Sequence, residues 1–123
     1  MLTVSKPAQF WWPVDVPVPA DNGTIAYQTI QVRFQALPDD KRAEMMESQI
    51  TDAGFTKAVV VDWSDGIDEA FSADALDQLL NNHPYVGRAI VEAYFGATNG
   101  QEYVAKNSST PSAPGRVATK AKR

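Results

Sequence analysis

The sequence predicts an α+β fold, in which an N-terminal β-hairpin is followed by three or four short helices. Before residue 37, apolar residues alternate with polar ones in two segments, and this period of two is typical of strands. After Pro38, apolar residues recur at intervals of three and four, the spacing of one helical face. We therefore expect the hairpin within residues 10–36 and the helices up to about residue 98.

The first predicted strand opens on the aromatic run Phe10-Trp11-Trp12. Its alternating apolar residues are Val14, Val16 and Val18. Prolines at positions 13, 17 and 19 have no N–H to donate, so the strand can pair on one side only and is predicted at a sheet edge. Asp21-Asn22-Gly23 predicts the turn, because Asn and Gly tolerate positive φ.

The second predicted strand carries its apolar face on Ile30, Val32 and Phe34. Ile25 and Tyr27 occupy odd-numbered positions, so on a regular strand they would face the other side from these three residues. Either a bulge lies near residues 28–29, or the strand crosses between two environments. Two strands alone are marginally stable, so the hairpin needs helices or a neighbouring subunit against its apolar face.

Pro38-Asp39-Asp40 predicts the start of a helix, because proline and acidic residues favour the first turn. A weak apolar stripe follows at Ala43, Met46 and Ile50, and Asp52-Ala53-Gly54 predicts its end. The next segment, residues 55–63, is ambiguous. Its valine run favours a strand, whereas the spacing of Phe55, Val59 and Trp63 favours a helix, and we predict a helix.

Two further helices are predicted after residue 71. Ser72 is a good N-cap for the first, whose inward stripe is Leu76, Leu79 and Leu80. Pro84 starts the second. Its inward stripe is Val86, Ile90, Ala93 and Tyr94, and Asn99-Gly100 ends it.

The composition predicts one domain, with residues 1–9 as a lead-in, residues 10–100 as the α+β domain and residues 101–123 as a disordered basic tail. From residue 106 onward Val117 is the only large apolar residue, so the tail cannot bury enough surface to offset its ordering entropy.

Six basic and fourteen acidic residues give residues 1–100 a charge of −8, whereas five basic residues and one acidic residue give the tail +4. Five scattered cations make a weak electrostatic footprint, so nucleic-acid binding is only a minor alternative.

Several classes of protein are excluded by residue type. The chain has no Cys, which excludes disulfides, thiolate metal sites and thiol nucleophiles. The first ten residues do not resemble a signal peptide, and the longest apolar run, Ala58–Val61, is too short to span a bilayer. We therefore expect a cytosolic protein that does not contact membranes.

No pattern of catalytic or cofactor-binding residues stands out. His83 is the only histidine, and a lone histidine cannot supply a zinc site. The acidic stretch from Asp62 to Glu69 lacks the ligand spacing of a calcium loop. Ser72 has no base placed to activate it. The sequence thus indicates a protein that is not an enzyme and needs no cofactor.

Adjacent aromatic residues suggest a partner-binding role instead. Trp11 and Trp12 face opposite ways on a strand, so one can enter the core while the other is exposed or covered by a partner, unless an irregular strand end buries both. Val91 and Phe95 form a second apolar face on the last helix, beside the stripe that contains Tyr94. The predicted partner-binding residues are therefore Trp11, Trp12, Val91, Tyr94 and Phe95, although the hairpin, another copy of the chain or the domain's own core could cover the same residues.

Six segments, taken in order, resemble the phage tail assembly chaperone family. They are the runs 10–18, 29–34, 60–67, 71–80, 89–95 and 105–107 (FWWPVDVPV, TIQVRF, VVDWSDGI, FSADALDQLL, AIVEAYF and AKN). Each is a packing pattern, and the signal lies in their order and spacing over about residues 10–107.

The resemblance implies a chaperone of the infected host cytoplasm that binds the tape measure protein, keeps it soluble and yields to tail tube subunits. It also implies that some members have a longer form, made by ribosomal frameshifting, that recruits the tail tube protein. Self-association is a further expectation. The alternatives are a minor structural tail or connector protein of the virion, and an acidic adaptor domain with a basic nucleic-acid-binding tail.

Overall fold

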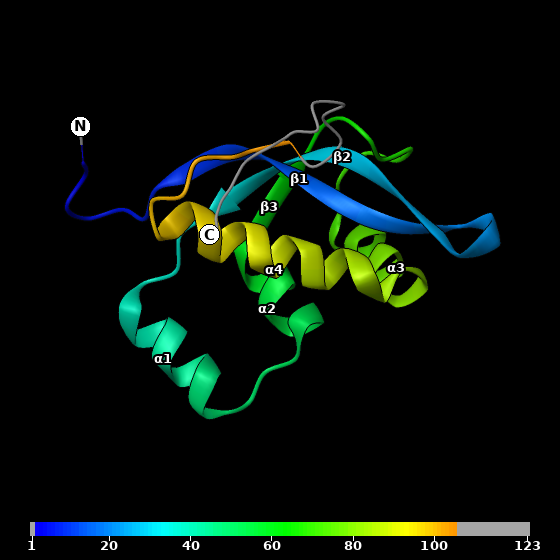
Figure 1. Cartoon of the computed structure of the whole chain (residues 1–123). Helices are drawn as coiled ribbons and strands as arrows, with labels where there is room; N and C mark the ends of the chain where they lie inside the picture. Colours follow the sequence, from blue (N-terminus) through cyan, green and yellow to red (C-terminus); the bar gives the residue numbers. More distant parts are fainter. Residues whose placement is uncertain (1, 106–123) are drawn as a thin grey trace, which may run out of the picture.

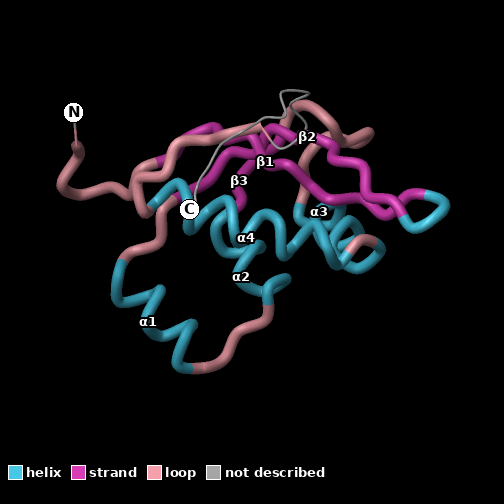
Figure 2. Tube along the Cα trace, in the orientation of Figure 1, coloured by secondary structure: helices cyan, strands magenta, loops and turns pink. Residues whose placement is uncertain are grey.

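A three-stranded antiparallel sheet with helices on one face forms the body of the protein (Figures 1 and 2). The structure is a computed structural model, and it describes residues 2–105. Within them the elements are, in chain order, β1 (Gln9–Ala20), a 3-10 turn (Asp21–Gly23), β2 (Thr24–Gln35), α1 (Asp39–Glu47), α2 (Asp52–Val59), β3 (Val60–Trp63), α3 (Ala73–Asn82) and α4 (Pro84–Thr98). The predicted α+β class, with its hairpin and helices, is confirmed. The predicted tail spans residues 101–123, of which residues 106–123 lie outside the described residues.

The hairpin pairs without interruption, from Gln9 opposite Gln35 to Ala20 opposite Thr24. A bulge near residues 28–29 is therefore absent, and the alternative interpretation, a strand between two environments, is correct. Ile25 lies on the opposite face of β2 and is 55% exposed, because the tip of the hairpin extends past the helices (Figure 1). The sheet order β1-β2-β3 confirms that β1 is an edge strand.

The core lies between the inner face of the sheet and the helices α2, α3 and α4 (Figure 1). Even-numbered residues of both hairpin strands face it. Those that are buried are Val14, Val16, Ile30, Val32 and Phe34. The ring of Tyr94 on α4 packs edge-on against Phe34, with centroids 5.5 Å apart, and against Phe55 on α2, at 5.4 Å. This aromatic cluster joins the sheet to the helical layer.

The ambiguous segment is half helix and half strand, so the prediction of a helix throughout residues 55–63 is wrong. Phe55 and Val59 share the buried face of α2, as the helical spacing predicted. The chain then changes to strand β3, where Trp63 lies opposite Val32 on β2. Arg33 pairs with Asp62 and Phe34 with Val60, which leaves Val61 as the extra residue of an irregular register. Pairing with the free side of β2 thus determines the structure of the valine run.

The first helix is shorter than predicted, because α1 ends at Glu47 and residues 52–54 begin α2. The Thr51 hydroxyl accepts a hydrogen bond from the Gly54 N–H at 3.0 Å, which makes Thr51 the N-cap of α2. No residue of α1 is buried, so the predicted weak stripe contributes no buried side chain from this helix. In Figure 1, α1 lies to one side of the other helices.

The last two helices agree with the prediction. The Ser72 hydroxyl accepts from the Ala75 N–H at 3.0 Å and caps α3, whose Leu76 and Leu80 are buried. Pro84 occupies the first turn of α4. Within residues 2–105, no helix combines the length and apolar character that a membrane crossing requires.

Gly66 should be far less replaceable than Gly23, although both have positive φ (93° and 75°). A Cβ on Gly66 would lie 2.7 Å from Ile30 Cγ2 and 2.8 Å from the Thr29 carbonyl oxygen, whereas one on Gly23 meets nothing within 4 Å. We expect Gly23→Ala to lower the free energy of unfolding by about 1 kcal/mol, and Gly66→Ala by about 1–3 kcal/mol more. Urea unfolding measures both. Equal losses would show that the loop after β3 does not need this close approach.

Candidate partner-binding site

The second apolar face of α4 is covered in part by α2. Phe95 packs against Phe55 with ring centroids 5.2 Å apart, and Val91 also packs against the core. Both side chains remain half-buried. The domain's own helix is thus the main cover of this face, and the part of each residue that is exposed is what a partner could contact.

Tyr94 lies inside the core and is only 2% exposed. Its hydroxyl oxygen accepts a hydrogen bond from the Leu37 N–H at 2.9 Å, just after β2. The side chain therefore fixes α4 to the chain that leaves the sheet. A direct contact between Tyr94 and a partner would require this packing to open.

The two adjacent tryptophans lie on opposite faces of β1. Trp12 faces the helices and packs edge-to-face against Phe10, with centroids 6.0 Å apart. Trp11 faces the other side of the sheet and is 44% exposed. The structure therefore does not gather the five predicted partner-binding residues into one site. It places Trp11 on the outer face of the sheet and Val91 and Phe95 beside α2.

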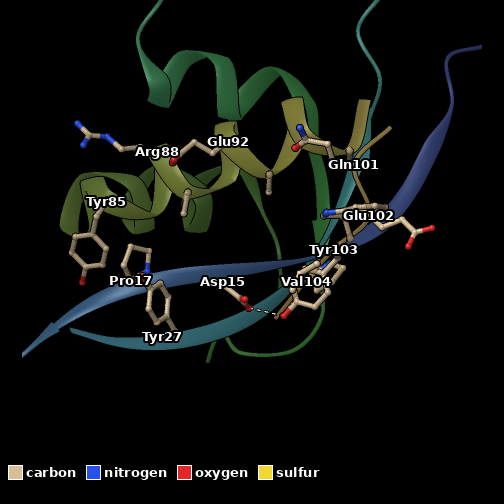
Figure 3. Close-up of a pocket in the computed structure, with 16 residues that line it drawn as sticks. Asp15, Pro17, Tyr27, Tyr85, Arg88, Glu92, Gln101, Glu102, Tyr103 and Val104 are labelled. Atoms are coloured by element: carbon tan, nitrogen blue, oxygen red, sulfur yellow. Dashed lines mark hydrogen bonds between the residues drawn. The ribbon is translucent and has the colours of Figure 1, made fainter. Parts of the chain in front are cut away.

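A cavity of about 340 Å³ lies between β1, α4 and the chain that follows α4 (Figure 3). Tyr27 and Tyr85 stand near one end, and residues 101–104 form the wall at the other. Sequence reasoning missed this site, because it assigned residues 101–104 to the tail. The available signal was Tyr103, an aromatic residue in an otherwise small and polar segment.

Residues 101–105, which we call the strap, are held against the sheet by Asp15. The Tyr103 hydroxyl donates to Asp15 Oδ1 at 2.8 Å (Figure 3), and the Thr29 hydroxyl donates to the same oxygen at 2.7 Å. The strap turns back from α4 where the Gln101 N–H donates to the Gly96 carbonyl at 2.9 Å. Partial burial and the hydrogen bond to Asp15 raise the pKa of Tyr103 above its ordinary value of 10.0, so the hydroxyl keeps its proton at neutral pH.

The titratable residues singled out in the sequence make ordinary local contacts. His83 Nδ1 lies 2.8 Å from the Tyr85 hydroxyl on the surface. The Asp62 carboxylate accepts from the Trp63 N–H at 2.8 Å. Among residues 2–105, no three His, Cys, Asp or Glu side chains come together as a metal site.

Comparison with known families matches residues 26–103 to the family described as phage tail assembly chaperone. The matched segment runs from β2 through α4 to Tyr103, and β1 precedes it. No curated protein matches the chain. No solved structure matches it either.

Removing the Tyr103 hydroxyl should free the strap and leave the fold intact. We expect Tyr103→Phe to speed amide hydrogen exchange in residues 101–105 about fivefold, because this factor corresponds to the free energy of one modest hydrogen bond. The melting temperature should stay nearly unchanged. Tyr27→Phe is the matched control, because Tyr27 lines the same cavity and its hydroxyl has no hydrogen-bond partner in the described part of the chain. Equal exchange in both variants would show that Asp15 does not hold the strap.

Proposed function

Because this chain belongs to the phage tail assembly chaperone family, we propose that it binds the tape measure protein and keeps it soluble during tail morphogenesis. The family match over residues 26–103 is the observation that carries this proposal, since it includes the whole helical layer. Family membership itself gives the chain a role in tail assembly, which involves binding tail proteins. The tape measure protein as the specific partner is our proposal.

A long helical tape measure protein exposes apolar stripes that would aggregate without cover. Small domains can cover such stripes by the helix-in-groove mode, in which an amphipathic helix presents residues at intervals of three and four. This chain offers partly exposed apolar side chains suited to that mode, on Trp11, Val91 and Phe95. Their separation on two surfaces supports contact with more than one stripe, or with one stripe and a second copy of the chain.

Weak binding by many copies is consistent with a chaperone that must later leave. Copies aligned along one filament hold it by avidity, yet each can be displaced singly as tail tube subunits polymerise. We place this activity in the host cytoplasm. Recruitment of the tail tube protein, if it needs a frameshifted longer form, would use residues beyond this chain.

Co-expression with the tape measure protein of the same phage tests the proposal. We expect the soluble fraction of the tape measure protein to rise several-fold with this chain and to stay low with an unrelated acidic protein of similar size. Purified virions, analysed by mass spectrometry, should lack the chain that infected-cell lysates contain.

Two outcomes would contradict the proposal. An unchanged soluble fraction would remove the tape measure protein as the partner. A stoichiometric amount of the chain in virions would favour a structural tail or connector protein.

A further inference from the structure

We propose that the outer face of the sheet, at Trp11 and Arg33, docks an amphipathic helix of the tape measure protein that presents a carboxylate to Arg33 and an apolar side chain to Trp11. The inference rests on the proposed function and adds the surface and the chemistry of its contact. We call Trp11 and Arg33 the outer-face pair.

Strand alternation places the outer-face pair opposite the core. Trp11 on β1 lies directly across from Arg33 on β2, and Arg33 lies across from Asp62 on β3. Their neighbours Trp12 and Val32 face the helices. Figure 1 shows α2, α3 and α4 on that inner side of the sheet only, with residues 101–105 crossing the other. Among residues 2–105, therefore, no helix lies over the outer face at Trp11.

Arg33 has no charged partner within residues 2–105. Its Nε is buried and donates no hydrogen bond, and its guanidinium forms no ion pair with a described residue. Asp62, across the strand pair, instead accepts from the Trp63 N–H. A buried guanidinium donor without an acceptor is rare in folded proteins, because desolvating a charge without a partner is costly. Arg33 as a whole is only half-buried, so a carboxylate from outside the chain can pair with its charge without reaching the buried Nε.

Trp11 gives the same surface an apolar anchor. It is 44% exposed, and tryptophan and arginine are the residue types most enriched among binding hot spots. Directly paired residues of antiparallel strands have Cβ atoms about 4.5–5.5 Å apart. Residues three or four apart on a helix have Cβ atoms at a similar separation, about 5–6 Å. One partner helix can therefore place an apolar residue on Trp11 and a Glu or Asp on Arg33.

The free edge of β1 argues for a helix rather than an added strand. The Ala8 carbonyl accepts from the Ala36 N–H, so even-numbered residues of this segment direct their backbone groups toward β2. Odd-numbered residues therefore face the free edge, where Pro13, Pro17 and Pro19 have no N–H to donate. An extended partner would find carbonyl acceptors but few donors along this edge. Docking through side chains on the face of the sheet does not need these backbone donors.

Binding to the tape measure protein, measured with purified full chains, tests the outer-face pair. We expect Arg33→Gln and Trp11→Ala each to weaken binding at least tenfold, and Arg33→Gln to reduce its dependence on salt. Arg88→Gln is the matched control, because Arg88 is an exposed arginine on α4 that forms no ion pair with a described residue. It should bind within twofold of the parent chain. Melting temperatures should stay within about two degrees, since the Arg33 side chain forms no hydrogen bond or ion pair with residues 2–105 that its loss would break.

The outcomes separate the two proposals. If the parent chain binds and the Trp11 and Arg33 variants bind equally well, the inference is wrong and the proposed function stands. If Arg88→Gln weakens binding as much as Arg33→Gln, the effect is one of net charge and the inference is also wrong. A large fall in melting temperature for Arg33→Gln would make Arg33 a structural residue and overturn its assigned role. A parent chain that does not bind at all contradicts both proposals.

Discussion

The contact of Tyr94 with Phe34 and Phe55 is the interaction on which the rest of the structure depends. It brings α4, the hairpin and α2 to one point, and the Tyr94 hydroxyl also accepts from the Leu37 N–H where the chain leaves the sheet. A hairpin alone is marginally stable in water, so its apolar face must be covered by other elements. Once α4 lies across the even-numbered face, α2 and α3 can only pack on the same side. Among residues 2–105, only residues 101–105 then cross the other face, at Asp15, and no helix covers it at Trp11.

Much of this arrangement follows from the spacing of apolar residues and from the residues that start helices, which can be read directly from the sequence. The alternation through Val14, Val16 and Ile30 assigns the inner face, and the prolines assign β1 to the edge. The N-cap Ser72 and the first-turn proline Pro84 determine where the last two helices begin. These features are local, because they depend on the preferences of residues close together in the chain. For that reason the sequence alone predicts them well.

The features that sequence reasoning missed depend on partners distant in the chain. Val60 becomes part of a strand because β2 offers an unpaired side, which the helical spacing of Phe55, Val59 and Trp63 does not reveal. Asp15 and Tyr103 are 88 positions apart, so no window of sequence connects them. The five predicted partner-binding residues divide in the same way. Alternation correctly placed Trp11 and Trp12 on opposite faces, whereas the burial of Tyr94 depends on where β2 ends relative to α4.

Under our proposal the chain is a chaperone for a filament. Such a chaperone must expose apolar surface without aggregating itself, and two features of this chain suit both demands. Prolines remove the N–H donors that would let the free edge of β1 pair with another strand. The net charge of −4 on the whole chain disfavours aggregation among its copies, while still allowing local contacts such as the one proposed for Arg33. Copies aligned along one tape measure protein would then be held by the filament more than by one another. Such a coat could be removed one copy at a time, as the proposed displacement by tail tube subunits would need.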